Sequence, residues 1–133
     1  MKKVFADTVG LLALWDRSDQ WHDAAETAFA ALARDQAKLV TTSFVMLECA
    51  NAAARRPYRG EVARLRDQLE CRGLLIHPTL DEWQGAWRSY AREGSQGAGV
   101  VDHVSFLIMR RLEIDAAFTN DQHFRAAGFQ LLF

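Results

Sequence analysis

Short apolar runs alternate along this chain with longer segments whose apolar residues recur every three or four positions. The helical spacing covers two segments, 21–32 and 101–112. The short runs predict strands at 3–6, 38–41, 74–77, 116–119 and 129–132. This alternation predicts an α/β fold built around a largely parallel sheet.

Polar residues indicate where two further helices begin and end. Thr42 or Ser43 can cap a helix that runs to Ala54 and ends before Pro57. We expect Asp81 to cap a later helix that carries two tryptophans. A helix therefore follows each of the first three predicted strands.

Length and composition predict one domain spanning 1–133. Half of the residues are hydrophobic and a quarter are charged, as in soluble globular proteins. The glycine-rich stretch 94–99 predicts a loop that is too short to separate two domains. Cys49 and Cys71 show no C-x-x-C pairing, and neither a signal-like start nor a membrane-spanning apolar stretch is present. We therefore expect a cytoplasmic protein with no membrane segment.

The formal net charge of -1 argues against coating nucleic acid by bulk electrostatics, so any RNA contact must be local. One short segment, 55–72, holds six of the 16 basic residues. Arg55 at its start is a candidate RNA contact. A solvated helix face with intrahelical ion pairs explains the segment equally well, because acids are interspersed among the arginines.

Two aspartates lie just beyond the ends of predicted strands. Asp7 comes after the first strand, and Asp121 follows the strand that ends at Thr119. Ligands bind beyond the carboxyl ends of parallel strands, although each aspartate alone is explained equally well as a helix cap. If the first and fourth strands are neighbours, the two carboxylates repel each other unless a cation binds between them.

Two more acids interrupt apolar helical segments. Glu48 lies within the apolar run 44–50, which predicts a buried helix in which a carboxylate needs a ligand or cation. Asn51, three residues later, shares its face. Asp102 falls in the first turn of its helix, where the helix dipole alone can explain it. Ser105 follows on the same face and is a candidate partner of that carboxylate or of a ligand.

Together the four acids predict a site for a hard cation. All-oxygen ligands suit Mg²⁺ or Mn²⁺, which keep waters and substrate phosphate as their other ligands. Such a site supports metal-assisted hydrolysis of phosphodiester bonds, with one ion or two. The predicted catalytic and metal-binding residues are Asp7, Glu48, Asp102 and Asp121.

Four stretches resemble the PIN-domain nucleases, and VapC-type toxins most of all. They are 5–8, 42–48, 101–106 and, most specific, 118–129, and the resemblance covers essentially the whole chain. It implies a three-layer α/β/α sandwich with a central, mostly parallel five-stranded sheet, Mg²⁺ or Mn²⁺ as cofactor, and endonucleolytic cleavage of RNA. It further implies a homodimer and inhibition by a small antitoxin protein. The four acids fall on the family's acidic positions.

Residues beside the acids are candidates for substrate contact or support: Thr8, Asn51, Ser105, Thr119, Asn120, His123 and Arg55. One departure from many relatives is the stretch 96–100, which lacks a lysine or tryptophan before the third acid.

Other chemistry finds less support. The four histidines do not have the spacing of a zinc site, and His123, although it could touch substrate, is better explained as a packed or surface residue. Trp83 and Trp87 share one helical face, which suggests core or dimer packing. Cys49 has no histidine partner in the sequence that would make it a nucleophile.

Two other functions could use the same acidic residues. A phosphoaspartate enzyme with Asp7 as acceptor needs a second aspartate two residues later, where Val9 stands. A catalytically silent PIN-like module that holds a partner's basic segment in its acidic pocket remains open.

Overall fold

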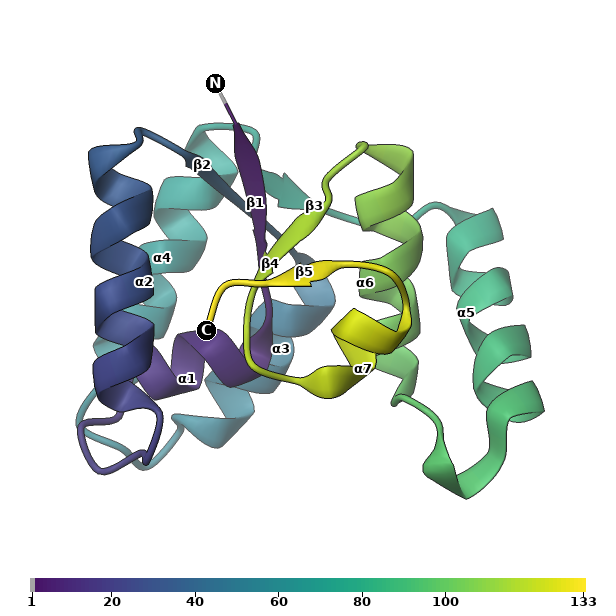
Figure 1. Cartoon of the computed structure of the whole chain (residues 1–133), viewed down its shortest axis with the longest axis horizontal. Coiled ribbons are helices and arrows are strands. Elements are labelled where there is room, and N and C mark those ends of the chain that lie inside the picture. Colours follow the sequence, from purple (N-terminus) through teal and green to yellow (C-terminus); the bar gives the residue numbers. More distant parts are fainter. Residues whose placement is uncertain (1) are drawn as a thin grey trace.

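The computed structural model describes residues 2–133 and contains a five-stranded parallel sheet. The strands run in the order β3-β2-β1-β4-β5, so β1 lies at the centre (Figure 1). Every pairing is parallel, which confirms the predicted sheet. The strands are β1 (Lys3–Ala6), β2 (Lys38–Thr42), β3 (Leu75–Ile76), β4 (Ala116–Phe118) and β5 (Gln130–Leu131). The two edge strands, β3 and β5, each have two residues where four were predicted.

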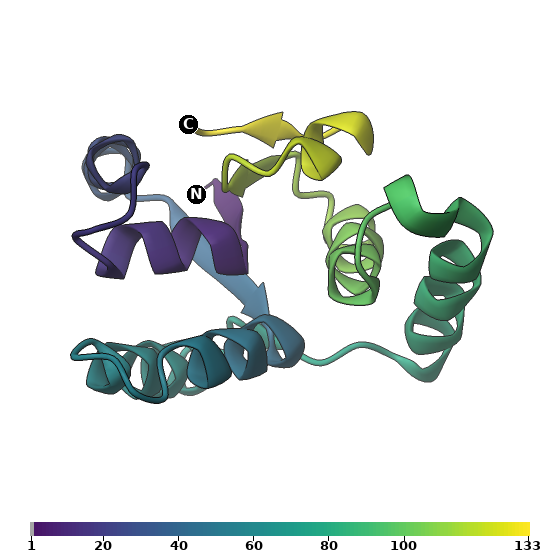
Figure 2. The same ribbon diagram turned by 90° about the horizontal axis from the view of Figure 1, so that it is seen from below.

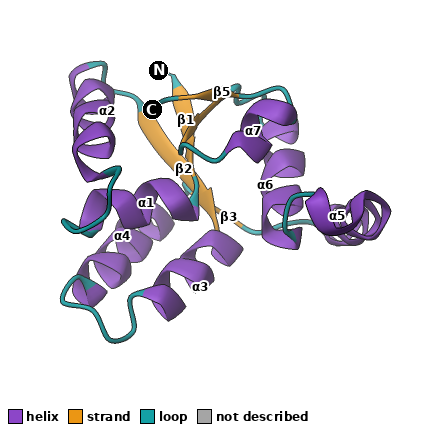
Figure 3. Ribbon diagram, turned by 60° about the horizontal axis from the view of Figure 1, so that its bottom comes forward, coloured by secondary structure: helices purple, strands orange, loops and turns teal. Residues whose placement is uncertain are grey.

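Helices cover both faces of the sheet, as the predicted α/β/α sandwich requires. One side carries α1 (Thr8–Trp15), α2 (His22–Arg34), α3 (Ser43–Ala52) and α4 (Arg59–Cys71). The other carries α5 (Leu80–Glu93), the short 3₁₀ helix η1 (Gly94–Gln96), α6 (Val100–Arg111) and α7 (Gln122–Ala126) (Figure 3). Right-handed crossovers explain this division, since the chain moves along the sheet in one direction up to β3 and then in the other.

The helix α5 packs on α6, on the outer side of that layer (Figure 2). No helix within residues 2–133 is long and apolar enough to cross a membrane.

The buried core forms two clusters, and β1 contributes to both. Val4 packs with Ala13, Ala25 and Phe118 in a small cluster beneath α1 and α2. Phe5, the next residue, belongs to a larger cluster that includes residues of α6. Successive side chains of a strand point to opposite faces, so β1 contributes to both clusters.

The caps of two helices test the predicted boundaries. The side chain of Thr42 accepts a hydrogen bond from Val45 N over 3.1 Å and caps α3, as predicted. The prediction for α5 was wrong, because Thr79 is the cap and Asp81 lies in the first turn. Thr79 Oγ1 accepts from Glu82 N over 3.1 Å, and Glu82 Oε1 accepts from Thr79 N over 2.9 Å. This reciprocal capping box satisfies two amides that a lone Asp81 cap would not.

Candidate active site

The carboxyl ends of β1 and β4 lie side by side at the centre of the sheet. Ala6 pairs with Phe118, and Asp7 and Thr119 come directly after them. The chain leaves these two neighbouring strands toward opposite faces of the sheet, which makes a topological switch point, where α/β proteins bind ligands. The condition that we set for Asp7 and Asp121 to approach each other, that the first and fourth strands be neighbours, is therefore met.

Asp7 occupies the N-cap position of α1, but its side chain makes no capping hydrogen bond. Its carboxylate instead accepts a hydrogen bond at Oδ2 from Thr119 Oγ1 over 3.0 Å. Only 1% of the residue is exposed. The helix-cap explanation of Asp7 therefore does not hold, and its carboxylate is a buried group held by the end of β4.

Burial, followed by the charges of Asp102 and Asp121, raises the pKa of Asp7 to about 7. The hydrogen bonds from Thr119 and from the Thr8 backbone act in the opposite direction and are outweighed. Such a carboxyl group ionises readily only when a positive charge is near.

Asp102 is half-buried in the first turn of α6. Burial, followed by the charges of Asp121 and Glu48, raises its pKa to about 6. A hydrogen bond from the Gly99 backbone lowers the pKa by less. Asp102 therefore lies close enough to Asp7, Glu48 and Asp121 for their charges to act on one another, so the four predicted acids face one region. The helix dipole is not the only explanation for an acid at this position.

Asp121 and its neighbour His123 lie in the same region. The Asp121 carboxylate caps α7 by accepting a hydrogen bond from His123 N over 2.9 Å, so its helix-cap explanation is correct. The same oxygen lies 3.0 Å from His123 Nδ1. Ligand atoms of Asp102, Asp121 and His123 all lie within 4.8 Å of one another, which is compatible with one ion. Burial would lower the pKa of His123, but its hydrogen bond to Asp121 and the charge of Asp121 raise it overall.

Glu48 differs from its prediction in one respect. We expected a buried helix, yet Glu48 is exposed, and its neighbour Leu47 is 62% exposed. The helix α3 buries only one stripe, which includes Val45 and Cys49. Glu48 nevertheless reaches the region, because its Oε1 accepts a hydrogen bond from Thr8 Oγ1 over 2.6 Å.

Thr119 joins the two acids that follow strands. Besides donating to Asp7, its hydroxyl accepts a hydrogen bond from Asp121 N over 3.1 Å. Neighbouring Asn120 is half-buried, and its side chain makes no hydrogen bond within residues 2–133. Among the predicted supporting residues, Thr8, Thr119 and His123 therefore contact the acids directly.

Three other predicted supporting residues do not contact the acids. Ser105 is buried and donates to the carbonyl oxygen of Val101 over 3.0 Å, so its proton is not available to Asp102. Asn51 is exposed and lines a pocket between α3 and α4, with no hydrogen bond to Glu48 among the described residues. Arg55 is exposed in the turn after α3, which ends earlier than predicted.

The remaining arginines of 55–72 behave largely as a solvated helix face. Arg64 pairs with Glu61 over 2.6 Å, and Arg66 pairs with Glu70 over 2.6 Å along α4. Cys49 is buried, and burial together with Asp7 and Glu48 raises the pKa of its thiol to about 12, which excludes a thiolate nucleophile.

Sequence reasoning did not single out Glu93, which organises the turn before Asp102. Its Oε2 accepts a hydrogen bond from Ala98 N over 3.1 Å and lies 3.2 Å from His103 Nε2. A Cβ atom on Gly97 would come within 2.4 Å of that carboxylate, so glycine is required there. The sequence signal that could have revealed Glu93 is the glycine-rich stretch that follows this acid at the end of its helix.

The four carboxylates fit a hard divalent cation. They are all-oxygen donors, two of them have raised pKa values caused partly by one another, and a bound cation would relieve their repulsion. A groove of about 810 Å³ lies elsewhere, between α2 and α4. Its lining is mainly aliphatic, so the carboxylate cluster is the better candidate for chemistry.

Comparison with known proteins agrees with this geometry. A model of the PIN domain matches residues 4–130. The chain belongs to the PIN domain family. This PIN domain is 30% identical over 127 residues to the 23S rRNA-specific endonuclease VapC20 of Mycobacterium tuberculosis, in strains CDC 1551 and H37Rv, with 95% of each chain covered. A crystal structure of M. tuberculosis VapC20, a sarcin-ricin loop cleaving toxin, matches it with a TM-score of 0.77 at 27% identity over 95% of each chain.

These matches confirm the resemblance to VapC-type PIN domains that the sequence motifs indicated, and the predicted fold with it.

Proposed function

We propose that this PIN domain is a metal-dependent endoribonuclease that acts at Asp7, Glu48, Asp102 and Asp121. The observation that carries the proposal is that these carboxylates lie close enough for their charges to affect one another's ionisation. Burial, followed by the charges of the neighbouring acids, raises the pKa of Asp7 to about 7 and that of Asp102 to about 6. Structural ion pairs do not explain it, because no arginine or lysine side chain within residues 2–133 bonds to any of the four. Membership of the PIN family and similarity to a named endonuclease support it.

Asp7, Asp102 and Asp121 would hold Mg²⁺ or Mn²⁺, with Glu48 beside them. When bound, the ion supplies Lewis acidity that lowers the pKa of water and stabilises the departing oxygen. The chain's own hydroxyls orient the carboxylates, Thr119 on Asp7 and Thr8 on Glu48. Supporting bonds of this kind fix the direction of a ligand oxygen and raise metal affinity.

The substrate we propose is an RNA loop. VapC20 is named for cleavage of 23S rRNA and of the sarcin-ricin loop. Proteins read RNA sequence mostly in loops, bulges and ends, where bases are unstacked. With a formal net charge of -1, this PIN domain cannot rely on bulk attraction, so shape and local contacts must select the RNA. The reaction belongs in the cytoplasm, where ribosomal RNA is found.

A small antitoxin is the proposed inhibitor, and the groove of about 810 Å³ between α2 and α4 is its proposed site. Leu32, Leu39, Leu65 and Leu69 lie among the groove's lining residues, and Arg72 adds a positive charge. An amphipathic antitoxin segment with an acidic residue would satisfy both features. Coexpression with the product of a neighbouring short reading frame tests this, because Leu65→Asp should then abolish copurification.

A homodimer is proposed through the row of aromatic side chains on α5. Trp83, Trp87 and Tyr90 are 39%, 42% and 47% exposed, so they are not core residues. Their rings meet edge to face at 5.8 and 5.6 Å, and Phe44 of α3 extends the row at 5.7 Å from Trp83. A row of exposed aromatic rings is typical of a protein interface. Sedimentation of Trp87→Glu should show a monomer where the unmodified chain shows a dimer.

The decisive experiment is cleavage of a 23S rRNA fragment with Mg²⁺ or Mn²⁺ and with EDTA. We expect cutting only with the metal, and a loss of at least about a hundredfold in Asp7→Asn. Asp35→Asn is the matched control, because it removes the same charge from an exposed position at the end of α2. Equal cutting by Asp7→Asn would indicate a contaminating nuclease. Inactivity on many RNAs would favour a module that holds a basic partner segment.

A further inference from the structure

A pocket of about 430 Å³ lies beside the carboxylates, where the end of α5, the segment 96–98, α6 and α7 meet. In Figures 1 and 2 the turn that joins α5 to α6 lies next to α7. Glu93, Gln96, His103, Phe106 and His123 are among the pocket's lining residues. The pocket therefore combines an acidic group, an amide and aromatic rings.

This pocket is continuous with the candidate active site through His123. The ring of His123 contacts Asp121 through Nδ1, at 3.0 Å, and also lines the pocket. A phosphate held at Asp102 and Asp121 would therefore place one of its two flanking nucleosides at the mouth of the pocket.

Glu93 presents a fixed hydrogen-bond acceptor in this pocket. Its Oε2 is engaged by Ala98 N and His103 Nε2, whereas its Oε1 has no hydrogen-bond partner among residues 2–133. Contact with Gly97 restricts the carboxylate further. The side chain is 43% exposed, so a ligand can reach it. An acceptor held in this way favours ligands that place an N–H group opposite it over ligands that place a carbonyl oxygen there.

Two features make the pocket suited to a nucleobase rather than to another phosphate. Its acid would repel a phosphate, while the rings of His103 and Phe106, packed edge to face at 5.6 Å, give it an aromatic wall. Arg110 lines the pocket, but its guanidinium lies over Phe129 at 5.4 Å and donates to the Ala127 carbonyl oxygen, so it is already engaged. Aromatic side chains and hydrogen bonds to base edges are how proteins read unpaired RNA.

We infer that this pocket binds the unpaired base next to the scissile phosphate, and that Glu93 selects a base with an amino group at the 4-position of a pyrimidine or the 6-position of a purine. Adenine and cytosine carry an amino group there, whereas uracil and guanine carry a carbonyl oxygen. The inference rests on the proposed function and names a base preference for that same site. Glu93 acts here as a specificity residue and takes no part in the chemistry at the carboxylates.

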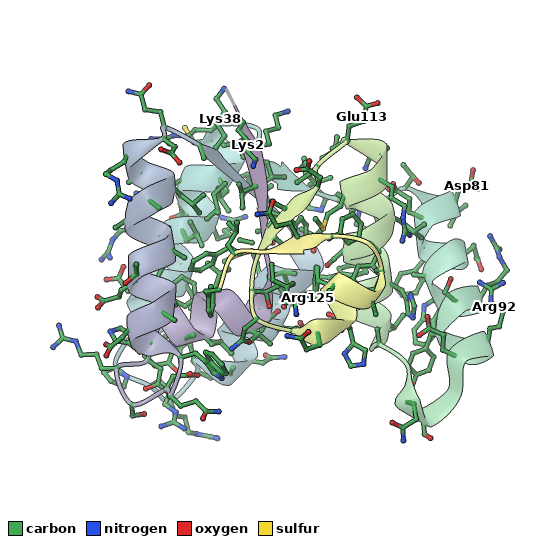
Figure 4. All side chains as sticks on the ribbon, in the orientation of Figure 1. Lys2, Lys38, Asp81, Arg92, Glu113 and Arg125 are labelled. Carbon is green, nitrogen blue, oxygen red and sulfur yellow. The ribbon has the colours of Figure 1, made fainter. Side chains whose placement is uncertain are left out.

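The test uses short RNA hairpins that differ only in the bases flanking the mapped cleavage position. We expect unmodified protein to cleave the adenine and cytosine variants about tenfold faster than the uracil and guanine variants at one flanking position. Glu93→Gln should reverse this order, because its amide oxygen can still accept from Ala98 N while its N–H₂ group faces the uracil carbonyl. Asp81→Asn is the matched control, since it removes a charge at the far end of α5 (Figure 4) and should leave the order unchanged.

A second variant guards against misfolding of Glu93→Gln. Ala126→Trp fills the pocket from α7 without altering Glu93, and should slow cleavage of every hairpin at least about tenfold. Titration with Mn²⁺ should show unchanged metal affinity in both variants, which separates loss of the pocket from damage to the carboxylates. Unchanged cleavage by Ala126→Trp would overturn the inference.

Binding of the same hairpins with Ca²⁺, followed by fluorescence anisotropy, separates this inference from the nuclease proposal. If the hairpins bind with a base preference in Ca²⁺ but are not cleaved in Mg²⁺ or Mn²⁺, the result would support the pocket and contradict the proposed function. Cleavage by both the unmodified protein and Glu93→Gln with the same base order would contradict the pocket alone.

Discussion

The hydroxyl of Thr119 donates a hydrogen bond to Oδ2 of Asp7 over 3.0 Å, across 112 positions of sequence. Oγ1 of Thr119 also accepts a hydrogen bond from the backbone N–H of Asp121 over 3.1 Å. One side chain therefore sets the relative position of the two acids that follow neighbouring strands. Because these strands pair in register just before the acids, the arrangement is a direct product of the sheet.

Replacing Thr119 by valine should impair the candidate site while preserving its packing. Valine has nearly the same shape as threonine but cannot donate to Asp7, which then loses an orienting bond. We expect Mn²⁺ affinity and RNA cleavage to fall about tenfold to a hundredfold, as for other residues that support metal ligands. Thr119→Ser keeps the hydroxyl and should retain most of both. Equal losses in the two variants would indicate a packing role instead.

Metal-free protein should lose stability as pH rises from about 4 to 7. The folded state raises the pKa of Asp7 from 3.8 to about 7, so in this window it keeps a proton that the unfolded chain has released. Stability is highest below the unfolded pKa, declines through the window and is constant above it. Asp102, raised from 3.8 to about 6, acts in the same direction.

Asp7→Asn cannot ionise and should remove much of this slope. At pH 8 without metal we expect the variant to be more stable than the unmodified protein, by about 1 to 3 kcal/mol. Urea denaturation at pH 5 and pH 8, in EDTA, measures the difference. A variant that is less stable at both pH values would show that the Asp7 carboxyl makes no unfavourable contribution when charged.

The acids that follow strands could be predicted, because a short stretch of sequence is enough to show them. An aspartate directly after an apolar strand is visible without a structure, and Asp7 and Asp121 were found in this way. Their proximity depended on which strands are neighbours, which was stated only as a condition. The pairing of β1 with β4 supplies it.

The parts that failed depend on tertiary packing. The apolar run around Glu48 predicted burial, but Leu47 is exposed on the surface, and exposed apolar residues cannot be told from core residues by type alone. Ser105 was expected to face Asp102, but its hydroxyl bonds the Val101 carbonyl oxygen within the helix. The role of Glu93 requires a folded turn, so its spacing alone could not reveal it.

Metal binding should release protons in an amount that depends on pH. At pH 6 the carboxyl of Asp7, with its pKa of about 7, is largely protonated, and a divalent cation must displace that proton. Mn²⁺ affinity and cleavage rate should therefore rise between pH 5.5 and 8, at most about tenfold per pH unit for each proton displaced.

Calorimetric titration in two buffers of different ionisation enthalpy counts the released protons. We expect between one and two at pH 6, because Asp102, with its pKa of about 6, is then also about half protonated, and far fewer at pH 8.5. A proton count that does not change with pH would contradict the raised pKa of Asp7.

Gly10 lies where α1, the helix that follows Asp7, crosses β4. A Cβ atom at this position would come within 2.0 Å of the Phe118 carbonyl oxygen, which is backbone and cannot move aside. Gly10→Ala should therefore destabilise the fold by about 3 kcal/mol or more and shift Asp7 away from Thr119.

Gly60 in α4 offers the matched control, since nothing lies within 4 Å of its added Cβ atom. Gly60→Ala should stabilise by about 0.5 kcal/mol, because alanine favours the helix. Thermal unfolding of both variants measures this contrast, and a Gly10→Ala protein as stable as the parent would show that α1 does not need its close approach to β4.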